Sequence, residues 1–146
     1  MSLRSLLTDD HKHCDDLFAA AEQAAGQDVA AAKAAFARFR EAMLAHFTGE
    51  EEILFPAFEA RTGMRMGPTQ VMRSEHAQMR ELMDDAVDLL AAGKSDDFLG
   101  QAETLLIMMQ QHNMKEENVL YPMCDQHLAG DAEALGRQLR DTLQAA

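Results

Sequence analysis

The segments HFTGEEEILFP, residues 46–56, and HNMKEENVLYP, residues 112–122, decide the fold of this chain. Both read H-x-x-x-E-E-x-x-L-x-P. A weaker echo precedes each segment, because Asp10-His11 and Glu75-His76 both place an acid directly before a histidine. The chain is therefore interpreted as a duplicated pair of helices. Each half supplies one lone histidine and one His-x-x-x-Glu pair.

Hydrophobic residues recur at helical spacing along almost the whole chain, and glycine and proline fall between the periodic blocks. Start signals follow these breaks, with Asp28 and Ser95 as expected N-caps and Pro68 at a first helical position. Short connections make consecutive long helices antiparallel. The pattern predicts an all-α fold, an up-down-up-down four-helix bundle with a short C-terminal fifth helix. The expected helices span about residues 3–25, 28–60, 68–92, 95–127 and 131–144.

Length and composition favour a single domain over residues 1–146, with the bundle core at about 3–127 and the last helix at about 131–144. The 25 acidic residues outnumber the 13 Lys and Arg, and no basic run exists, which argues against nucleic-acid binding. The N-terminus turns acidic after seven residues, so neither a signal peptide nor a membrane span is expected there. A cytoplasmic location without membrane contact is predicted, with Cys14 and Cys124 as thiols and Cys14 buried and inert.

Each long helix presents metal-binding types of side chain on its apolar face. His11 shares its face with Leu7 and Phe18, and the third helix repeats this arrangement around its own histidine. The core face of the fourth helix is expected to extend to Val119 and Met123. The candidate ligands are His11, His46, Glu50, His76, His112 and Glu116.

Burying two carboxylates requires compensation, because an unpaired buried charge costs several kcal/mol. No Lys or Arg lies on the same faces near Glu50 or Glu116. One histidine on an apolar face is usually a satisfied core residue, but six matched groups favour a multivalent cation. Six ligands are too many for one tetrahedral zinc and suit two adjacent metals. Mixed imidazole and carboxylate ligands favour iron, then manganese, with zinc as a possible substitute.

These residues resemble the hemerythrin-like family, the HHE cation-binding domain, over about residues 3–127. The resemblance rests on His11, on the two segments quoted first, and on GPTQVMRSEH, residues 67–76. It implies two iron ions in a non-haem di-iron centre that binds dioxygen or a related small molecule. Glu50 and Glu116 would be the bridges, usually with an oxide, and the four histidines the terminal ligands.

The chain departs from the oxygen-carrying hemerythrins at two points. Position 72 is Met where the carriers have another histidine, and Glu116 replaces an Asp found one position later. The set is more similar to that of the bacterial iron-centre-repair proteins, with a more open coordination site beside Met72. Binding or sensing of dioxygen or nitric oxide is therefore favoured over a dedicated enzyme. The alternatives are turnover of peroxide or nitric oxide, iron delivery to damaged iron-sulfur centres, and a structural protein that carries zinc or no metal.

Several other polar residues are expected to lie outside the ligand set. His13 and His127 are placed at the surface, and Glu51 and Glu117 are placed beside the ligands or at the surface. Tyr121, the only tyrosine, could hydrogen-bond near the site, but core packing beside Leu120 is favoured.

Two features concern the ends of the helices. Pro56 and Pro122 are expected to bend theirs. In the last helix Leu135, Leu139 and Leu143 recur every four residues. They are expected to dock on the bundle, and a homodimer contact is the alternative.

Overall fold

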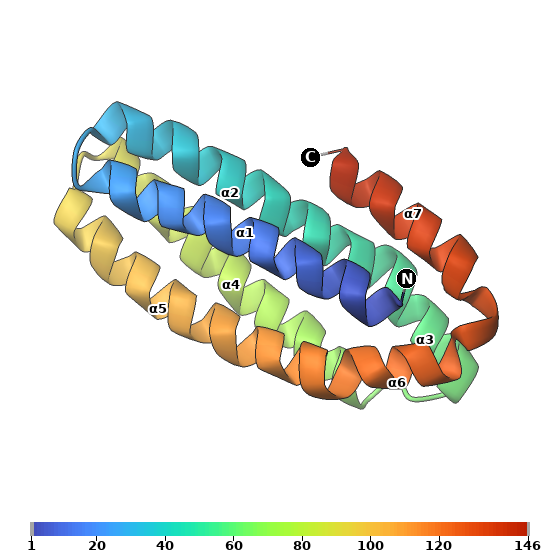
Figure 1. Ribbon diagram of the computed structural model, residues 1–146. Coiled ribbons are helices and arrows are strands. Elements are labelled where there is room, and N and C mark those ends of the chain that lie inside the picture. Colours follow the sequence, from blue (N-terminus) through green and yellow to red (C-terminus); the bar gives the residue numbers. More distant parts are fainter. Residues whose placement is uncertain (1, 146) are drawn as a thin grey trace.

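The computed structural model describes residues 2–145, and helices account for nearly all of them (Figure 1). No strand occurs within this range. Four long helical rods form the bundle. The first rod is α1 and the third is α4. The second rod consists of α2, the π-helical turn η1 and α3, and the fourth consists of α5, the π-helical turn η2 and α6. The elements are α1 (Leu3–Ala25), α2 (Val29–Gly49), η1 (Glu50–Leu54), α3 (Phe55–Thr62), α4 (Pro68–Ala91), α5 (Ser95–Lys115), η2 (Glu116–Leu120), α6 (Tyr121–His127), the 3₁₀ turn η3 (Ala129–Asp131) and α7 (Ala132–Gln144).

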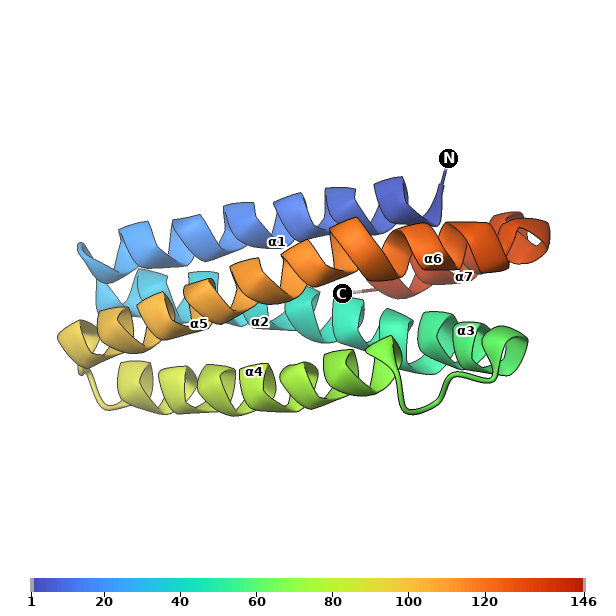
Figure 2. The ribbon, with the colours of Figure 1, turned by 90° about the horizontal axis from the view of Figure 1, so that it is seen from below.

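The four long rods run antiparallel to their neighbours in the chain, and α7 folds back along the outside of α2 (Figures 1 and 2). The predicted all-α bundle with a short fifth helix is confirmed. Among residues 2–145, every helix is too short or too polar to cross a membrane.

Most predicted helix ends agree with the structure to within two residues. Asp28 caps α2 as predicted, and its carboxylate accepts a hydrogen bond from the backbone N–H two residues further on. Ser95 was expected to cap α5, but this is wrong, because Ser95 is already helical and Lys94 holds the cap position without a side-chain bond. Gly63 and Gly93 follow α3 and α4 with φ of 76° and 72°, a left-handed conformation that favours glycine.

Both His-x-x-x-Glu segments lead into a π-helical turn. The backbone N–H of Phe55 donates to the carbonyl of Glu50, and that of Tyr121 donates to the carbonyl of Glu116. Each bond spans five residues, whereas an α-helical bond spans four. One extra residue is therefore accommodated in each turn, and the buried face shifts along the sequence.

This shift changes which residues reach the core. Leu120 and Tyr121 are almost fully buried, whereas the Val119 side chain is 54% exposed. The expectation that Val119 continues the core face is wrong, because it assumed an unbroken α-helix. Pro56 and Pro122 are the second residues of α3 and α6, just beyond the two turns, and they lack the N–H that an α-helical bond would need. Figure 2 shows the rod changing direction between α5 and α6.

The core has two apolar clusters, one on each side of the candidate ligands along the bundle axis. In α1, Leu7 belongs to one cluster and Cys14 to the other, with His11 between them. In α4, Met72 and Met79 flank His76 in the same way. The polar groups are thus enclosed by hydrocarbon from both ends.

The C-terminal helix α7, which is the predicted fifth helix, docks on the bundle as expected. Leu135 and Leu139 are buried, and Leu143 is half-buried. A Cβ atom at Gly49 would lie 3.2 Å from the Leu139 side chain, so α7 approaches α2 closely where η1 begins.

We expect Phe36→Ala to destabilise the protein strongly without changing its metal content. The Phe36 ring is 1% exposed, and its centroid lies 5.4 Å from that of Phe39 and 5.3 Å from that of Phe98. Truncating a buried phenylalanine lowers the free energy of unfolding by about 3–5 kcal/mol. Phe36 precedes His46 by about 15 Å of helix at 1.5 Å per residue. Denaturant titration and metal analysis check both parts, and an equal loss of metal would contradict the separation.

Candidate metal centre

The structure brings all six candidate ligands together in the bundle core. The histidines come from α1, α2, α4 and α5, and the glutamates are the first residues of the two π-helical turns. All six are at most 5% exposed. The set consists of His11, His46, Glu50, His76, His112 and Glu116.

The donor atoms form two overlapping groups, which we call half-sites. The first half-site contains His11, His46 and Glu116, and the second contains Glu50, His76, His112 and Glu116. Within each group the candidate ligand atoms lie within 4.8 Å of one another. Glu116 therefore belongs to both.

Both carboxylates reach across the gap between the half-sites. Oε1 of Glu116 lies 3.1 Å from Nε2 of His11 and 3.2 Å from Nε2 of His112. Glu50 places Oε2 at 3.5 Å from Nε2 of His46 and Oε1 at 3.0 Å from Nε2 of His76. Each carboxylate is thus adjacent to one histidine of each half-site, which is the placement a bridging ligand needs.

The unpaired polar atoms show that these residues fit a cation. Six side-chain polar atoms among residues 2–145 are buried without a hydrogen-bond partner, and four of them belong to the second half-site. These four are Glu50 Oε1, Glu116 Oε2, His76 Nε2 and His112 Nε2. Buried polar atoms are normally paired, so such a cluster of acceptors and imidazole nitrogens needs a partner. A metal ion accepts electron pairs from all of these atoms at once.

Electrostatics couple the buried carboxylates to the imidazoles. Burial lowers the pKa of His112, but the carboxylates around it, Glu116 first and then Glu50 and Glu75, together outweigh burial and raise that pKa to about 9. Burial likewise lowers the pKa of His46, and Glu50, with Asp10 and Glu116, more than reverses the effect. Burial raises the pKa of Glu50, yet His46 holds it well below its usual range. Without metal, the glutamates therefore draw protons onto the imidazoles. A bound cation would replace those protons, so its binding releases them.

Each candidate histidine also forms a hydrogen bond through Nδ1 to a carboxylate outside the set of six, which we call an outer carboxylate. An ionised carboxylate only accepts, so Nδ1 carries the hydrogen and leaves Nε2 for a metal. The pairs are His11 with Glu117 at 2.6 Å, His46 with Asp10 at 2.8 Å, His76 with Glu51 at 2.6 Å, and His112 with Glu75 at 2.8 Å. All four imidazoles are thereby held in one orientation.

The outer carboxylates follow the sequence duplication. Asp10 and Glu75 precede the lone histidines, and Glu51 and Glu117 follow Glu50 and Glu116. Glu51 and Glu117 were expected beside the ligands or at the surface, and the hydrogen bonds place them beside the candidate ligands. The roles of Asp10 and Glu75 were missed, although the acid before each lone histidine was a signal that could have identified them. Within residues 2–145, Arg80 pairs with Glu51 and Lys115 with Glu75, whereas Asp10 and Glu117 form no pair with Lys or Arg.

We expect Glu51→Gln to weaken metal binding by about 10–100-fold, the usual effect of losing an outer partner of a ligand. Burial raises the pKa of Glu51, but hydrogen bonds from His76 and Arg80 lower it to about 2, so this carboxylate is ionised at neutral pH. A neutral amide would orient His76 less firmly. Competition with a chromophoric chelator measures the affinity. Glu52→Gln is the matched control, because Glu52 is exposed; equal effects of the two substitutions would refute the assignment.

Tyr121 is buried in the same core cluster as Leu120, as favoured from the sequence, but its hydroxyl also lies among the candidate ligands, which was the alternative. Its hydroxyl oxygen is 2.6 Å from Glu50 Oε2, 3.0 Å from Glu116 Oε1, and 3.2 Å from Nε2 of both His11 and His46. Burial raises the pKa of Tyr121, and the Glu116 and Glu50 carboxylates raise it further. The π-helical turn η2 brings Tyr121 onto the ligand face, and a regular helical count does not predict that position.

The remaining candidates lie where they support or surround the site. Cys14 and Cys124 are free and buried, and burial raises the pKa of both thiols, which makes them poor metal ligands at neutral pH. His13 and His127 are exposed, as predicted. Met72 is buried in the same apolar cluster as Tyr121, and its role beside an open coordination position stays a prediction.

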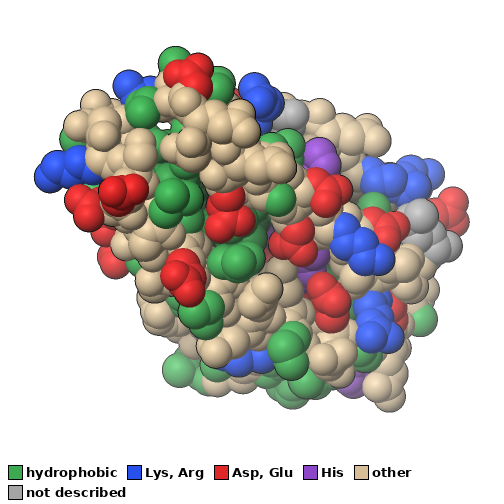
Figure 3. Space-filling model, turned by 60° about the vertical axis from the view of Figure 1, so that its left-hand side comes forward, with side chains coloured by type: hydrophobic (Ala, Val, Ile, Leu, Met, Phe, Trp, Pro, Cys, Tyr) green, Lys and Arg blue, Asp and Glu red, His purple; other side chains and the backbone are tan. Residues whose placement is uncertain are grey.

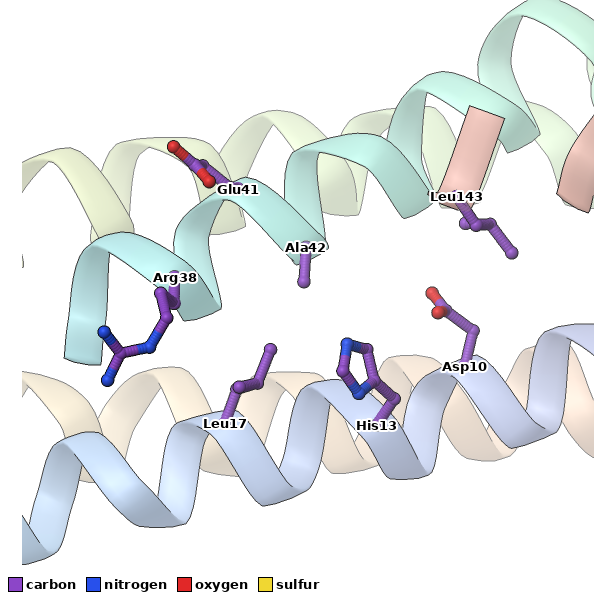
Figure 4. A pocket seen from close by; sticks show the side chains of 7 residues that line it. All are labelled: Asp10, His13, Leu17, Arg38, Glu41, Ala42 and Leu143. Carbon is purple, nitrogen blue, oxygen red and sulfur yellow. The ribbon is translucent and has the colours of Figure 1, made fainter. Parts of the chain in front are cut away.

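A surface pocket of about 260 Å³ lies next to the site, between α1 and α2 (Figure 4). Asp10, His13 and Arg38 point into it. Asp10 is also the residue that accepts the hydrogen bond from His46. Solvent therefore reaches the outer carboxylate that orients one ligand. In Figure 3, acidic side chains spread across the face shown, in keeping with the formal net charge of −12.

An antiparallel helical bundle that converges four imidazoles and two carboxylates in its core defines a cation-binding protein of the helical-bundle class. The family model described as the Hemerythrin HHE cation binding domain matches residues 2–124. The chain therefore belongs to this family, and the match takes in α1 to α5 and much of α6, but not α7. Searches of curated proteins and of solved structures found no match.

Proposed function

We propose that this protein holds two iron ions, one in each half-site, and binds dioxygen or nitric oxide there. The observation that carries the proposal is the convergence of six buried ligands, with Glu50 and Glu116 placed between two pairs of histidines. Six protein ligands exceed the needs of one tetrahedral ion. Imidazole and carboxylate ligands in a helical bundle favour iron, and manganese or zinc could substitute for it.

When bound, the metal pair would supply coordination positions and redox chemistry for a small diatomic molecule. The chain supplies orientation, because the outer carboxylates fix every imidazole. It also supplies enclosure: the Phe47 ring stacks on His76 at 4.0 Å between centroids, and Phe55 stacks on the same imidazole at 5.8 Å. Apolar walls so close to the ligands favour small ligands and keep bulk water out.

Absorption spectroscopy on the iron-loaded protein tests this function. The reduced protein is prepared under nitrogen and is then exposed separately to dioxygen and to nitric oxide. New charge-transfer bands are expected with each gas. His112→Ala should lose these bands, whereas His13→Ala should keep them, because His13 is exposed and outside both half-sites. Identical spectra before and after both gases would refute the proposal.

One observation favours a second candidate, turnover of peroxide or nitric oxide or delivery of iron to damaged iron-sulfur centres. The Tyr121 hydroxyl lies within 3.2 Å of Nε2 of both histidines of the first half-site, whereas four polar atoms of the second have no hydrogen-bond partner. A less saturated metal would be open to a reacting ligand. Steady-state consumption of peroxide, compared between the wild-type iron form and His112→Ala, distinguishes catalysis from simple binding. Equal rates in the two proteins would exclude the site from turnover.

A further inference from the structure

We propose that Tyr121 is a seventh protein ligand, bound through its phenolate oxygen to the metal of the first half-site, and that exogenous ligands therefore bind at the second half-site. This inference rests on the proposed two-metal function. The sequence alone predicted a ligand set of four histidines and two glutamates, without Tyr121.

The position of the hydroxyl oxygen is that of a ligand. Metal–ligand bonds of about 2.1 Å place neighbouring ligand atoms about 3.0 Å apart at right angles. The Tyr121 oxygen lies 3.2 Å from Nε2 of His11, 3.2 Å from Nε2 of His46 and 3.0 Å from Oε1 of Glu116. The separation between His11 Nε2 and Glu116 Oε1 is similar, at 3.1 Å. The phenol oxygen thus completes a group of atoms spaced as around one ion.

Hydrogen bonding alone does not satisfy this group once the imidazoles have lost the extra protons that they carry in the metal-free protein. In the neutral imidazoles that bind metal, Nδ1 of His11 and His46 donates to the outer carboxylates, so Nε2 of each can only accept. The facing oxygens of Glu50 and Glu116 also accept. The phenol has one hydrogen for these four acceptors. A cation satisfies all of them together with the phenol oxygen, whose proton leaves to solvent as the metal binds.

The internal duplication shows that the second half-site lacks this oxygen. Phe55 occupies the position of Tyr121 in the repeated segment. Its ring lies 5.8 Å from the His76 ring at 18°, and the Tyr121 ring lies 5.6 Å from the His11 ring at 27°. The two aromatic rings are therefore placed alike, but only one carries a hydroxyl. The second metal has one protein ligand fewer, which leaves a position for an exogenous ligand.

The spectroscopic test uses the fact that the chain contains one tyrosine. Any phenolate-to-iron(III) charge-transfer band, and any tyrosinate mode enhanced in the resonance Raman spectrum, must come from Tyr121. We expect both in the iron-loaded wild type. Tyr121→Phe should lose both signals, whether it keeps two irons or loses the iron of the first half-site. Wild-type protein with two irons and no tyrosinate signal would overturn the inference but leave the proposed function standing. Wild-type protein without iron would overturn both.

Azide, used as the probe, tests which half-site is open. In the wild type, an azide band should appear while the tyrosinate band persists; displacement of the tyrosinate by azide would overturn the assignment. Phe55→Tyr is the matched gain-of-ligand variant. A second phenolate should increase the charge-transfer intensity and weaken azide binding at least tenfold. A folded Phe55→Tyr protein with added tyrosinate intensity and unchanged azide affinity would place the open position elsewhere.

Discussion

Glu116→Ala is expected to abolish binding of both metal ions under conditions that fully load the wild type. Oε1 of Glu116 lies 3.1 Å from Nε2 of His11 and 3.2 Å from Nε2 of His112, so this carboxylate belongs to both half-sites. Its loss removes a ligand and a negative charge from each ion. The affinity should fall by more than the roughly 10–100-fold that follows loss of an outer partner.

Metal analysis after equilibrium dialysis measures this effect. Glu103→Ala is the matched control, because Glu103 lies on the same rod but is exposed. It should keep two ions per chain. A Glu116→Ala protein that retains one ion at wild-type affinity would show that Glu116 serves only one half-site.

Removal of the metal is expected to lower the melting temperature without unfolding the protein at room temperature. The metal-free chain can pair its buried glutamates with protonated histidines, as the raised pKa values of His46 and His112 indicate. The bound ions stabilise the folded state by mass action, by about 2.7 kcal/mol for each ion at a free concentration one hundred times its Kd. A chain of this size gains about 2–4 °C per kcal/mol, so each ion raises Tm by roughly 5–11 °C.

Thermal melts with and without a strong chelator measure the shift. The Glu116→Ala protein should melt at one temperature in both conditions, because it has no bound metal to lose. A wild-type Tm that does not respond to chelation would show that the metal is incidental to the fold.

The helices could be predicted from the sequence because local signals define them. Glycine and proline separate periodic blocks, and Asp28 caps α2 as its position indicates. The six candidate ligands could also be selected in advance, because the duplicated motif repeats the same residue types at the same spacing. Their convergence in the structure follows from the antiparallel packing of four amphipathic rods.

The rest depends on features that helical periodicity does not encode. A constant count of 3.6 residues per turn placed Val119 in the core and favoured core packing of Tyr121 over a hydrogen bond near the site. The π-helical turn η2 leaves Val119 exposed and brings the Tyr121 hydroxyl to the candidate ligands. The pairing of Asp10 with His46 joins two helices, so it requires their relative register and not only their patterns. Ser95 was predicted to be an N-cap from its residue type, but it is the first residue of α5. Residue type alone does not separate these two positions.

Anomalous diffraction at the iron absorption edge, from crystals of the iron-loaded protein, would locate the metal ions directly. Two peaks are expected in the bundle core, one in each half-site, with Glu50 and Glu116 between them. Each peak should lie at a bonding distance of about 2.1 Å from the Nε2 atoms of two histidines. A single core peak, or peaks only on surface carboxylates, would contradict a two-metal centre.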